Sequence, residues 1–233
     1  MVVRDHHDRL EVVLGRRRPG SAFVPNMYVF PGGAVDEDDR GPAFLSDVLE
    51  SSEGDQDGQG IRLANERVTA VRETFEETGL LLAVNADRSW LNAAQHREAS
   101  AFRADVAASS LPLGQVFQRC SLMLPFERLH VWGRWVTPRG AVRRYDTRFF
   151  VCEAPPGQEP VPDGSEMVQC AWWTPQQALR GWEEGTIGLV HPTVKALEGL
   201  ARFPTARSLF ETLAQRGTVP GVLPSPMGAG PRA

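Results

Sequence analysis

The nine residues from Arg72 to Leu80 constrain this chain more than any other stretch. They read Arg-Glu-Thr-Phe-Glu-Glu-Thr-Gly-Leu, which combines an Arg-Glu pair, a Glu-Glu pair three residues later and a glycine before an apolar run. At about 100° per residue, the segment from Ala64 onward predicts an amphipathic helix with apolar residues on one side and glutamates on the other. We expect Gly79 to end this helix.

The glutamates of the predicted helix crowd one side of it, at positions 66, 73, 76 and 77. Like charges at this spacing repel one another, which destabilises an isolated helix by a few tenths of a kcal/mol for each pair. One interpretation is a solvated acidic face, as for most charge runs. The other is a compensating cation, because hard divalent ions such as Mg²⁺ prefer carboxylate oxygens as ligands.

A second motif lies upstream, where Tyr28-Val29-Phe30-Pro31-Gly32-Gly33 predicts a strand that ends in a glycine turn. Glycine has no Cβ, so this backbone can approach a phosphate or a metal closely. The presence of this turn therefore favours the interpretation in which the glutamates bind a cation over the one in which they form a solvated acidic face.

The two motifs together resemble the Nudix hydrolases, whose box reads G-x5-E-x7-R-E-U-x-E-E-x-G-U, where U is apolar. The second half of the box matches at Arg72, Glu73, Glu76, Glu77, Gly79 and Leu80, with Thr74 at a position that is usually apolar. The first half differs. Counting back from Arg72 places Ala64 at the first box glutamate and Gly58 at the box glycine. We interpret Gly32-Gly33 as the true loop and Gly58 as accidental. Glu66 is then either a substitute for the missing glutamate or a solvated side chain.

The resemblance implies an α/β (α+β) Nudix fold, with a mixed β-sheet sandwiched between helices and an added helical block. It also implies a metal-dependent hydrolase that cleaves the diphosphate linkage of a nucleoside diphosphate derivative. The implied ligands of Mg²⁺ or Mn²⁺ are Glu73, Glu76 and Glu77, together with the backbone near Gly32 or Gly33. Arg72 is expected to orient these carboxylates through an ion pair.

The general base and the phosphate contacts are less directly implied. Family members use either a box glutamate, here Glu76 or Glu77, or a glutamate on a distant loop, for which Glu166 is the main candidate and Glu153 and Glu159 are weaker ones. The candidates for substrate binding are Arg17, Gly32, Gly33 and Arg148. Each of these charged side chains also fits an ordinary solvated position.

Residues 135–138 and 143–150 and the insertion resemble the branch that contains peroxisomal coenzyme A diphosphatases and their bacterial relatives. The coenzyme A signature of another Nudix branch is met in part, at Arg17 and at residues 30–33, but Asn26 stands where that signature has glycine. Coenzyme A or an acyl-CoA is the first expected substrate. ADP-ribose, NADH or dinucleoside polyphosphates are alternatives, as is a non-catalytic nucleotide-sensing module, against which the intact acidic set argues.

Composition narrows the class of protein further. A net charge of −4 and a pI near 5.8 disfavour nucleic-acid binding through phosphate contacts. No apolar run approaches the ~20 residues that span a bilayer, so we expect no membrane partner and a cytoplasmic location. We expect one Nudix domain over residues 1–217, with an acidic loop insertion at 36–60 and a helical insertion at 85–119, and a Pro/Gly-rich tail at 218–233. A homodimer is one assembly that the resemblance suggests.

The remaining elements follow from local patterns. The strands predicted from alternation or from apolar runs cover residues 9–14, 80–84, 129–138, 145–152 and 168–173. The helices predicted after the last strand begin behind Thr174, near Pro192 and at Ala206.

Overall fold

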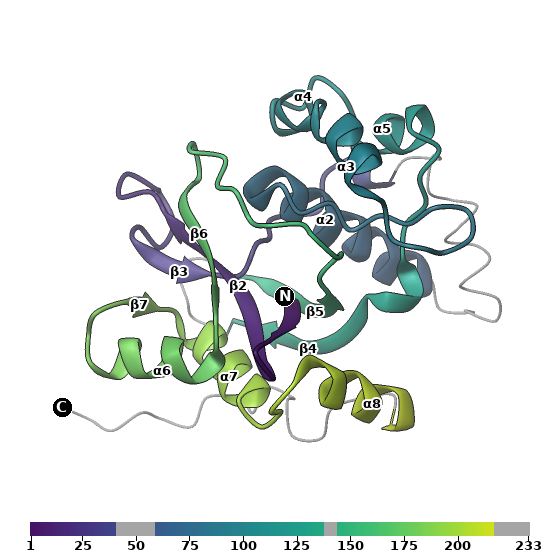
Figure 1. The fold of residues 1–233 in the computed structure, drawn as a ribbon. Helices are drawn as coiled ribbons and strands as arrows, with labels where there is room; N and C mark the ends of the chain where they lie inside the picture. The colour runs from purple at the N-terminus through teal and green to yellow at the C-terminus, as the bar shows by residue number, and fades with distance from the viewer. Residues whose placement is uncertain (41–58, 138–143, 217–233) are drawn as a thin grey trace.

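The computed structural model describes residues 1–40, 59–137 and 144–216 (Figure 1). Seven strands in these residues form one mixed sheet with the order β4-β5-β1-β2-β3-β7, and β6 pairs with β2. The strands are β1 Val2–His6, β2 Arg9–Arg17, β3 Met27–Val29, β4 His130–Val136, β5 Asp146–Glu153, β6 Met167–Trp173 and β7 Gly188–Leu189.

Strand β2 is the centre of the sheet, since it pairs antiparallel with β1, β3 and β6. Its side chains alternate between the two faces, as a pleated strand requires. Val12 and Leu14 join one core cluster, whereas Val13 joins the other. The register of β2 against β6 shifts between Arg16 and Arg17. Such irregularities change the direction of side chains and are common near functional sites. This one lies at the end of β2, where Arg17 approaches Glu77 of the predicted box.

Helices cover both faces of the sheet (Figure 1). On one side lie α2 Gln59–Thr78 and the helical insertion, which consists of α3 Ala93–Ser100, α4 Arg103–Ala107 and α5 Leu113–Arg119. On the other side lie α6 Pro175–Glu183, α7 His191–Leu200 and α8 Ala206–Arg216. Two short 3₁₀ turns, η1 Asp38–Arg40 and η3 Phe126–Arg128, complete the described elements. The expected arrangement of a mixed sheet between helices is thereby confirmed.

The predicted box helix is α2, and its periodicity explains its packing. Ala64, Val68, Val71 and Phe75 are all buried in the core cluster beneath the helix. The helix begins at Gln59, earlier than the apolar pattern indicates, and Gly79 follows its last residue with φ +71°. Only glycine adopts this conformation readily, so Gly79 ends the helix as predicted.

The structure differs from the prediction at several elements, among them the two-residue strand β7, which was not predicted. The apolar run 80–84 is not a strand, because the structure gives it only isolated bridges from Val84 to Trp90 and Met123. The side-chain amide of Gln158 satisfies both the N–H and the C=O of Leu81, at 2.8 and 3.3 Å, in place of a neighbouring strand. Conversely, β1 was not predicted, since its second half is polar.

Several predicted features lie outside the described residues: most of the acidic insertion with Gly58, positions 138 and 143, and the tail at 218–233. Within the described parts of the chain, no helix has the length and apolar character needed to cross a membrane.

Candidate active site

Arg72 is the centre of the polar network on α2. Its guanidinium donates two hydrogen bonds to Asp39, from Nε at 2.8 Å and from Nη2 at 3.0 Å. Asp39 is 2% exposed and also accepts hydrogen bonds from the Thr69 hydroxyl and the Asp36 N–H, at 2.8 and 2.9 Å. Arg72 donates further to the Ala34 carbonyl at 3.1 Å. The network thereby fixes the segment after the glycine loop against the middle of α2.

Arg72 also holds two of the predicted metal ligands. Its Nη1 lies 3.0 Å from Glu73 Oε1 and 3.1 Å from Glu76 Oε2. Burial raises the pKa of Glu73 to about 7, against the opposing charge of Arg72. Burial likewise raises the pKa of Glu76, with Arg72 again acting in the opposite direction. The expected orienting role of Arg72 agrees with this geometry.

Glu77 is the most enclosed carboxylate of the group, at 3% exposed. Its Oε2 accepts a hydrogen bond from the Gly32 N–H at 2.9 Å, while its Oε1 is buried without a hydrogen-bond donor in the described residues. Burial and the neighbouring charge of Glu73 raise the pKa of Glu77 well above its usual value. A carboxylate oxygen in this position requires a proton or a cation.

The glycine loop touches the same carboxylates. A Cβ at Gly33 would lie 2.2 Å from Glu73 Oε1, so only glycine leaves room for that carboxylate. The Gly32 N–H is bonded to Glu77, as described above. The structure therefore brings the loop into contact with Glu73 and Glu77, as the two motifs predicted, whereas Glu76 is held by Arg72.

The carbonyl end of α2 is held by the helical insertion and by a distant loop. Arg103 donates to the Glu76 carbonyl from Nε at 3.1 Å and from Nη2 at 2.9 Å, and Nη2 also bonds the Val161 carbonyl at 2.8 Å. The Val161 N–H donates to the Thr78 carbonyl at 2.7 Å. A ring nitrogen of His96 lies 3.3 Å from the Gly79 carbonyl. Carbonyls that a helix end leaves unpaired thus find partners, and cationic Arg103 also complements the helix dipole.

Arg17 and Glu166 lie beside Glu77. Arg17 Nη1 is 3.8 Å from Glu77 Oε1, and Nη2 is 3.3 Å from Glu166 Oε2. The Arg17 side chain is 16% exposed, and its Nε is buried without a hydrogen-bond acceptor in the described residues. Glu166 stays largely exposed, at 61%. Both residues therefore reach the rim of the carboxylate cluster from other elements.

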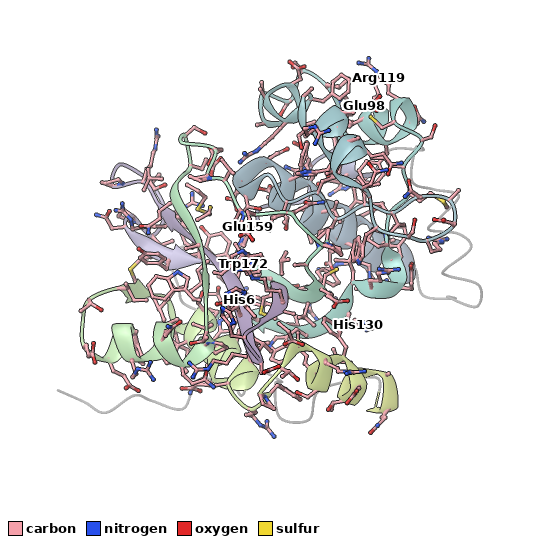
Figure 2. All side chains as sticks on the ribbon, in the orientation of Figure 1. His6, Glu98, Arg119, His130, Glu159 and Trp172 are labelled. Atoms are coloured by element: carbon pink, nitrogen blue, oxygen red, sulfur yellow. The ribbon has the colours of Figure 1, made fainter. Side chains whose placement is uncertain are left out.

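The remaining candidates lie elsewhere. Arg148 forms a 2.5 Å ion pair with Glu66, about two helical turns from Glu73. Glu66 also forms an ion pair with Arg62 at 3.1 Å, and its side chain is largely buried, so it is not a solvated glutamate. Its partners are Arg62 and Arg148 and not Arg72, so it does not substitute for the missing box glutamate either. Glu159 bonds the indole N–H of Trp172 at 2.6 Å, and Figure 2 shows these two residues next to each other. Glu153 is an exposed residue at the end of β5.

Asp39 is the functional residue that sequence analysis missed. Counting back from Arg72 placed the first acidic residue of the box at Ala64, but Ala64 is buried in the core, and Asp39 holds Arg72 instead. Asp39 stands six residues after Gly33, which is the glycine-to-acid spacing of the box. Counting forward from the glycine loop would have found it, so the insertion interrupts the box after its first acidic residue.

The donor set fits a divalent cation chemically, since hard ions take carboxylate and backbone oxygens. Oε1 of Glu77 is buried without a hydrogen-bond donor in the described residues, and burial raises the pKa values of Glu73 and Glu77, so a cation among these carboxylates would stabilise their charged forms. In this conformation no three potential ligand side chains in the described residues are already grouped for a metal. Arg72 draws the carboxylates of Glu73 and Glu76 toward itself.

Comparison with known proteins extends this picture. The family described as NUDT19 Nudix domain matches residues 52–200. The Xenopus laevis protein named acyl-coenzyme A diphosphatase NUDT19 is 27% identical over 241 residues, which covers 88% of this chain and 63% of the relative. The human protein of the same name is 28% identical over 238 residues, covering 86% and 63%.

Two further matches broaden the comparison. A Caenorhabditis elegans protein named putative nudix hydrolase 7 is 28% identical over 193 residues, covering 82% of this chain and 56% of the relative. The chain thus spans less than two thirds of each of these curated relatives. The crystal structure of a Nudix hydrolase from Alicyclobacillus acidocaldarius superposes with a TM-score of 0.67 at 26% identity, covering 94% of both chains.

Proposed function

The chain belongs to the NUDT19 Nudix family, and from this premise we propose that it is a metal-dependent diphosphatase that acts on coenzyme A or an acyl-coenzyme A. The reaction class is taken from relatives named acyl-coenzyme A diphosphatases. The observation that carries the proposal is the set of box glutamates beside the glycine loop. Glu73 and Glu77 contact the loop, Glu76 shares Arg72 with Glu73, and Oε1 of Glu77 is buried without a hydrogen-bond donor in the described residues.

Glu73, Glu76 and Glu77, with the backbone near Gly32, would hold Mg²⁺ or Mn²⁺. A bound dication supplies charge neutralisation for the diphosphate and a more acidic water, both of which favour attack at phosphorus. Arg72 keeps the carboxylates of Glu73 and Glu76 in place, and Asp39 keeps Arg72 in place.

Arg17 is the proposed phosphate contact. Its guanidinium reaches the edge of the carboxylate cluster, and its buried Nε–H has no acceptor in the described residues. A guanidinium binds phosphate oxygens in a bidentate fashion. Gly32 and Gly33 leave the neighbouring backbone open to the substrate, whereas Arg148 has its charge matched by Glu66.

Glu166 is the proposed general base, because it approaches the cluster from a loop and lies largely in solvent, where it can exchange a proton with water. Replacement by glutamine tests this role. If Glu166 is the base, Glu166→Gln lowers kcat by about 10²-fold or more while Mn²⁺ affinity stays unchanged. An unchanged kcat would assign the base to Glu76 or Glu77 instead.

The proposed activity is tested with a substrate panel in Mg²⁺ or Mn²⁺: coenzyme A, an acyl-coenzyme A, ADP-ribose, NADH and a dinucleoside polyphosphate. We expect the coenzyme A compounds to be cleaved fastest, giving 3′,5′-ADP and a phosphopantetheine product. Glu77→Gln should lower the rate by about 10²-fold or more. Glu98→Gln should not, because Glu98 is an exposed glutamate of the helical insertion (Figure 2).

If ADP-ribose, NADH or the dinucleoside polyphosphate is cleaved faster than the coenzyme A compounds, the proposed substrate is wrong, but the proposed diphosphatase reaction stands. The absence of turnover on every substrate, with tight nucleotide binding retained, would favour the nucleotide-sensing module.

A further inference from the structure

A cavity of about 540 Å³, open to solvent, lies on the face of the sheet opposite the carboxylate cluster. Its volume is in the usual range for small-molecule sites, about 300–1,000 Å³. The lining consists of Arg16, Asn26, Tyr28, Gln169 and residues 185–188. Tyr28 belongs to the core cluster beneath α6, α7 and α8, whereas Arg17, the next residue along β2 from Arg16, reaches Glu77. The sheet therefore separates this cavity from the candidate active site.

The side-chain amides of Asn26 and Gln169 can donate hydrogen bonds to a ligand in this cavity, because their oxygens already accept hydrogen bonds from neighbouring residues. The Tyr28 hydroxyl donates to Gln169 Oε1 at 3.0 Å, and Arg16 Nη1 donates to Asn26 Oδ1 at 3.4 Å. Each amide oxygen is thus already used, which leaves the NH₂ groups of Asn26 and Gln169 available. Asn26 is held at φ +59°, a conformation that asparagine tolerates better than most residues.

The charge of the cavity is positive. Among the described residues, Arg16 has no carboxylate within ion-pair distance, and the hydrogen bond of its side chain goes to a neutral amide. No aspartate or glutamate lines the cavity in the part of the chain that the structure describes. A guanidinium and two amide NH₂ groups without an opposing acid match the needs of an oxyanion, since N–H donors to a charged acceptor form strong hydrogen bonds.

We propose that this cavity is a second binding site, which takes the phosphate group of a small phosphorylated metabolite. Arg16 supplies the charge, and the NH₂ groups of Asn26 and Gln169 supply directional hydrogen bonds. Because Arg16 and Arg17 point to opposite faces of β2, binding here requires neither the box carboxylates nor a metal ion.

The test uses inorganic phosphate as the probe, with the full chain in EDTA so that no metal is bound. Isothermal titration calorimetry and thermal unfolding are followed for the wild type, Arg16→Gln and the charge-matched control Arg18→Gln. Arg17→Gln is measured as well, to detect phosphate that binds at the candidate active site instead. Arg18 is the exposed neighbour on the same segment. We expect phosphate to bind the wild type and Arg18→Gln alike, and to bind Arg16→Gln about tenfold more weakly, through loss of a charged hydrogen bond. Arg17→Gln should keep the phosphate binding that depends on Arg16.

Gln169→Leu provides a second test that keeps the charge. It removes the amide NH₂ and should weaken phosphate binding several-fold, with Arg16 still present. Phosphate affinity in Arg16→Gln equal to that of the wild type would overturn the proposal. So would loss of phosphate binding in Arg17→Gln alone, because that result would place the anion at the box.

Discussion

Replacement of Asp39 by asparagine tests the most consequential contact of the site. Asp39 is 2% exposed, and it accepts two hydrogen bonds from Arg72 and one each from the Thr69 hydroxyl and the Asp36 N–H. Asparagine has nearly the same shape as aspartate but carries no charge. Its NH₂ group would replace an oxygen that accepts hydrogen bonds and would face the N–H or O–H donors that bind that oxygen. The substitution therefore leaves the Arg72 guanidinium without its buried counter-ion while changing little else.

The expected loss of stability follows from the burial of the pair. Breaking a buried ion pair by removing one partner costs about 3–5 kcal/mol. Arg72 keeps Glu73 and Glu76 as partners, so we expect the lower end, about 3 kcal/mol. For a chain of this size, that corresponds to a fall in Tm of about 6–12 °C.

The assay is urea unfolding of the wild type, Asp39→Asn and Asp38→Asn, followed by hydrolysis measurements on the folded variants. Asp38 is an exposed neighbour in the same 3₁₀ turn and serves as the matched control. We expect Asp38→Asn to behave like the wild type and Asp39→Asn to lose both stability and kcat. Equal stability of the two variants would refute the assignment of Asp39 as the anchor of Arg72.

Three further predictions test other contacts. Gly33→Ala should lower kcat with little change in stability, because the new Cβ displaces the flexible end of Glu73; Gly20→Ala, which meets no atom within 4 Å, should change neither. Arg103→Gln should destabilise the chain in urea by about 1.5–3 kcal/mol, through loss of charged hydrogen bonds to the end of α2, and an unchanged midpoint would contradict this. Burial lowers the pKa of His130, so its contribution to stability is present above about pH 6.5, the ordinary histidine pKa, and is lost as pH falls from there through the lowered pKa of the folded state. The wild type should therefore lose more stability than His130→Asn between pH 7 and 5, and parallel losses would contradict this origin.

The parts of the fold that the sequence predicts correctly are those that depend on residues close together in the chain. The helical spacing of Val68, Val71 and Phe75 placed one face of α2 in the core, and Gly79 ended the helix. The Thr174-Pro175 pair marked the start of α6, where the structure has a capping box. Each of these features depends on residues a few positions apart, so one sequence was enough.

The missed features depend on residues that are far apart. Asp39 and Arg72 are brought together across the long insertion, and counting back within the box cannot reach a residue on its other side. The apolar run 80–84 was ambiguous, because burial alone does not distinguish a strand from an extended core segment. Its partner, the side chain of Gln158, lies 77 residues from Leu81.

Mn²⁺ binding measured by electron paramagnetic resonance tests the central claim most directly. The wild type and Asp38→Asn should take up Mn²⁺ with equal affinity, whereas Glu73→Gln and Glu77→Gln should bind it at least about tenfold more weakly, through loss of a charged ligand. Mn²⁺ binding that is the same in all four proteins would contradict the claim that the carboxylates of α2 form the metal site.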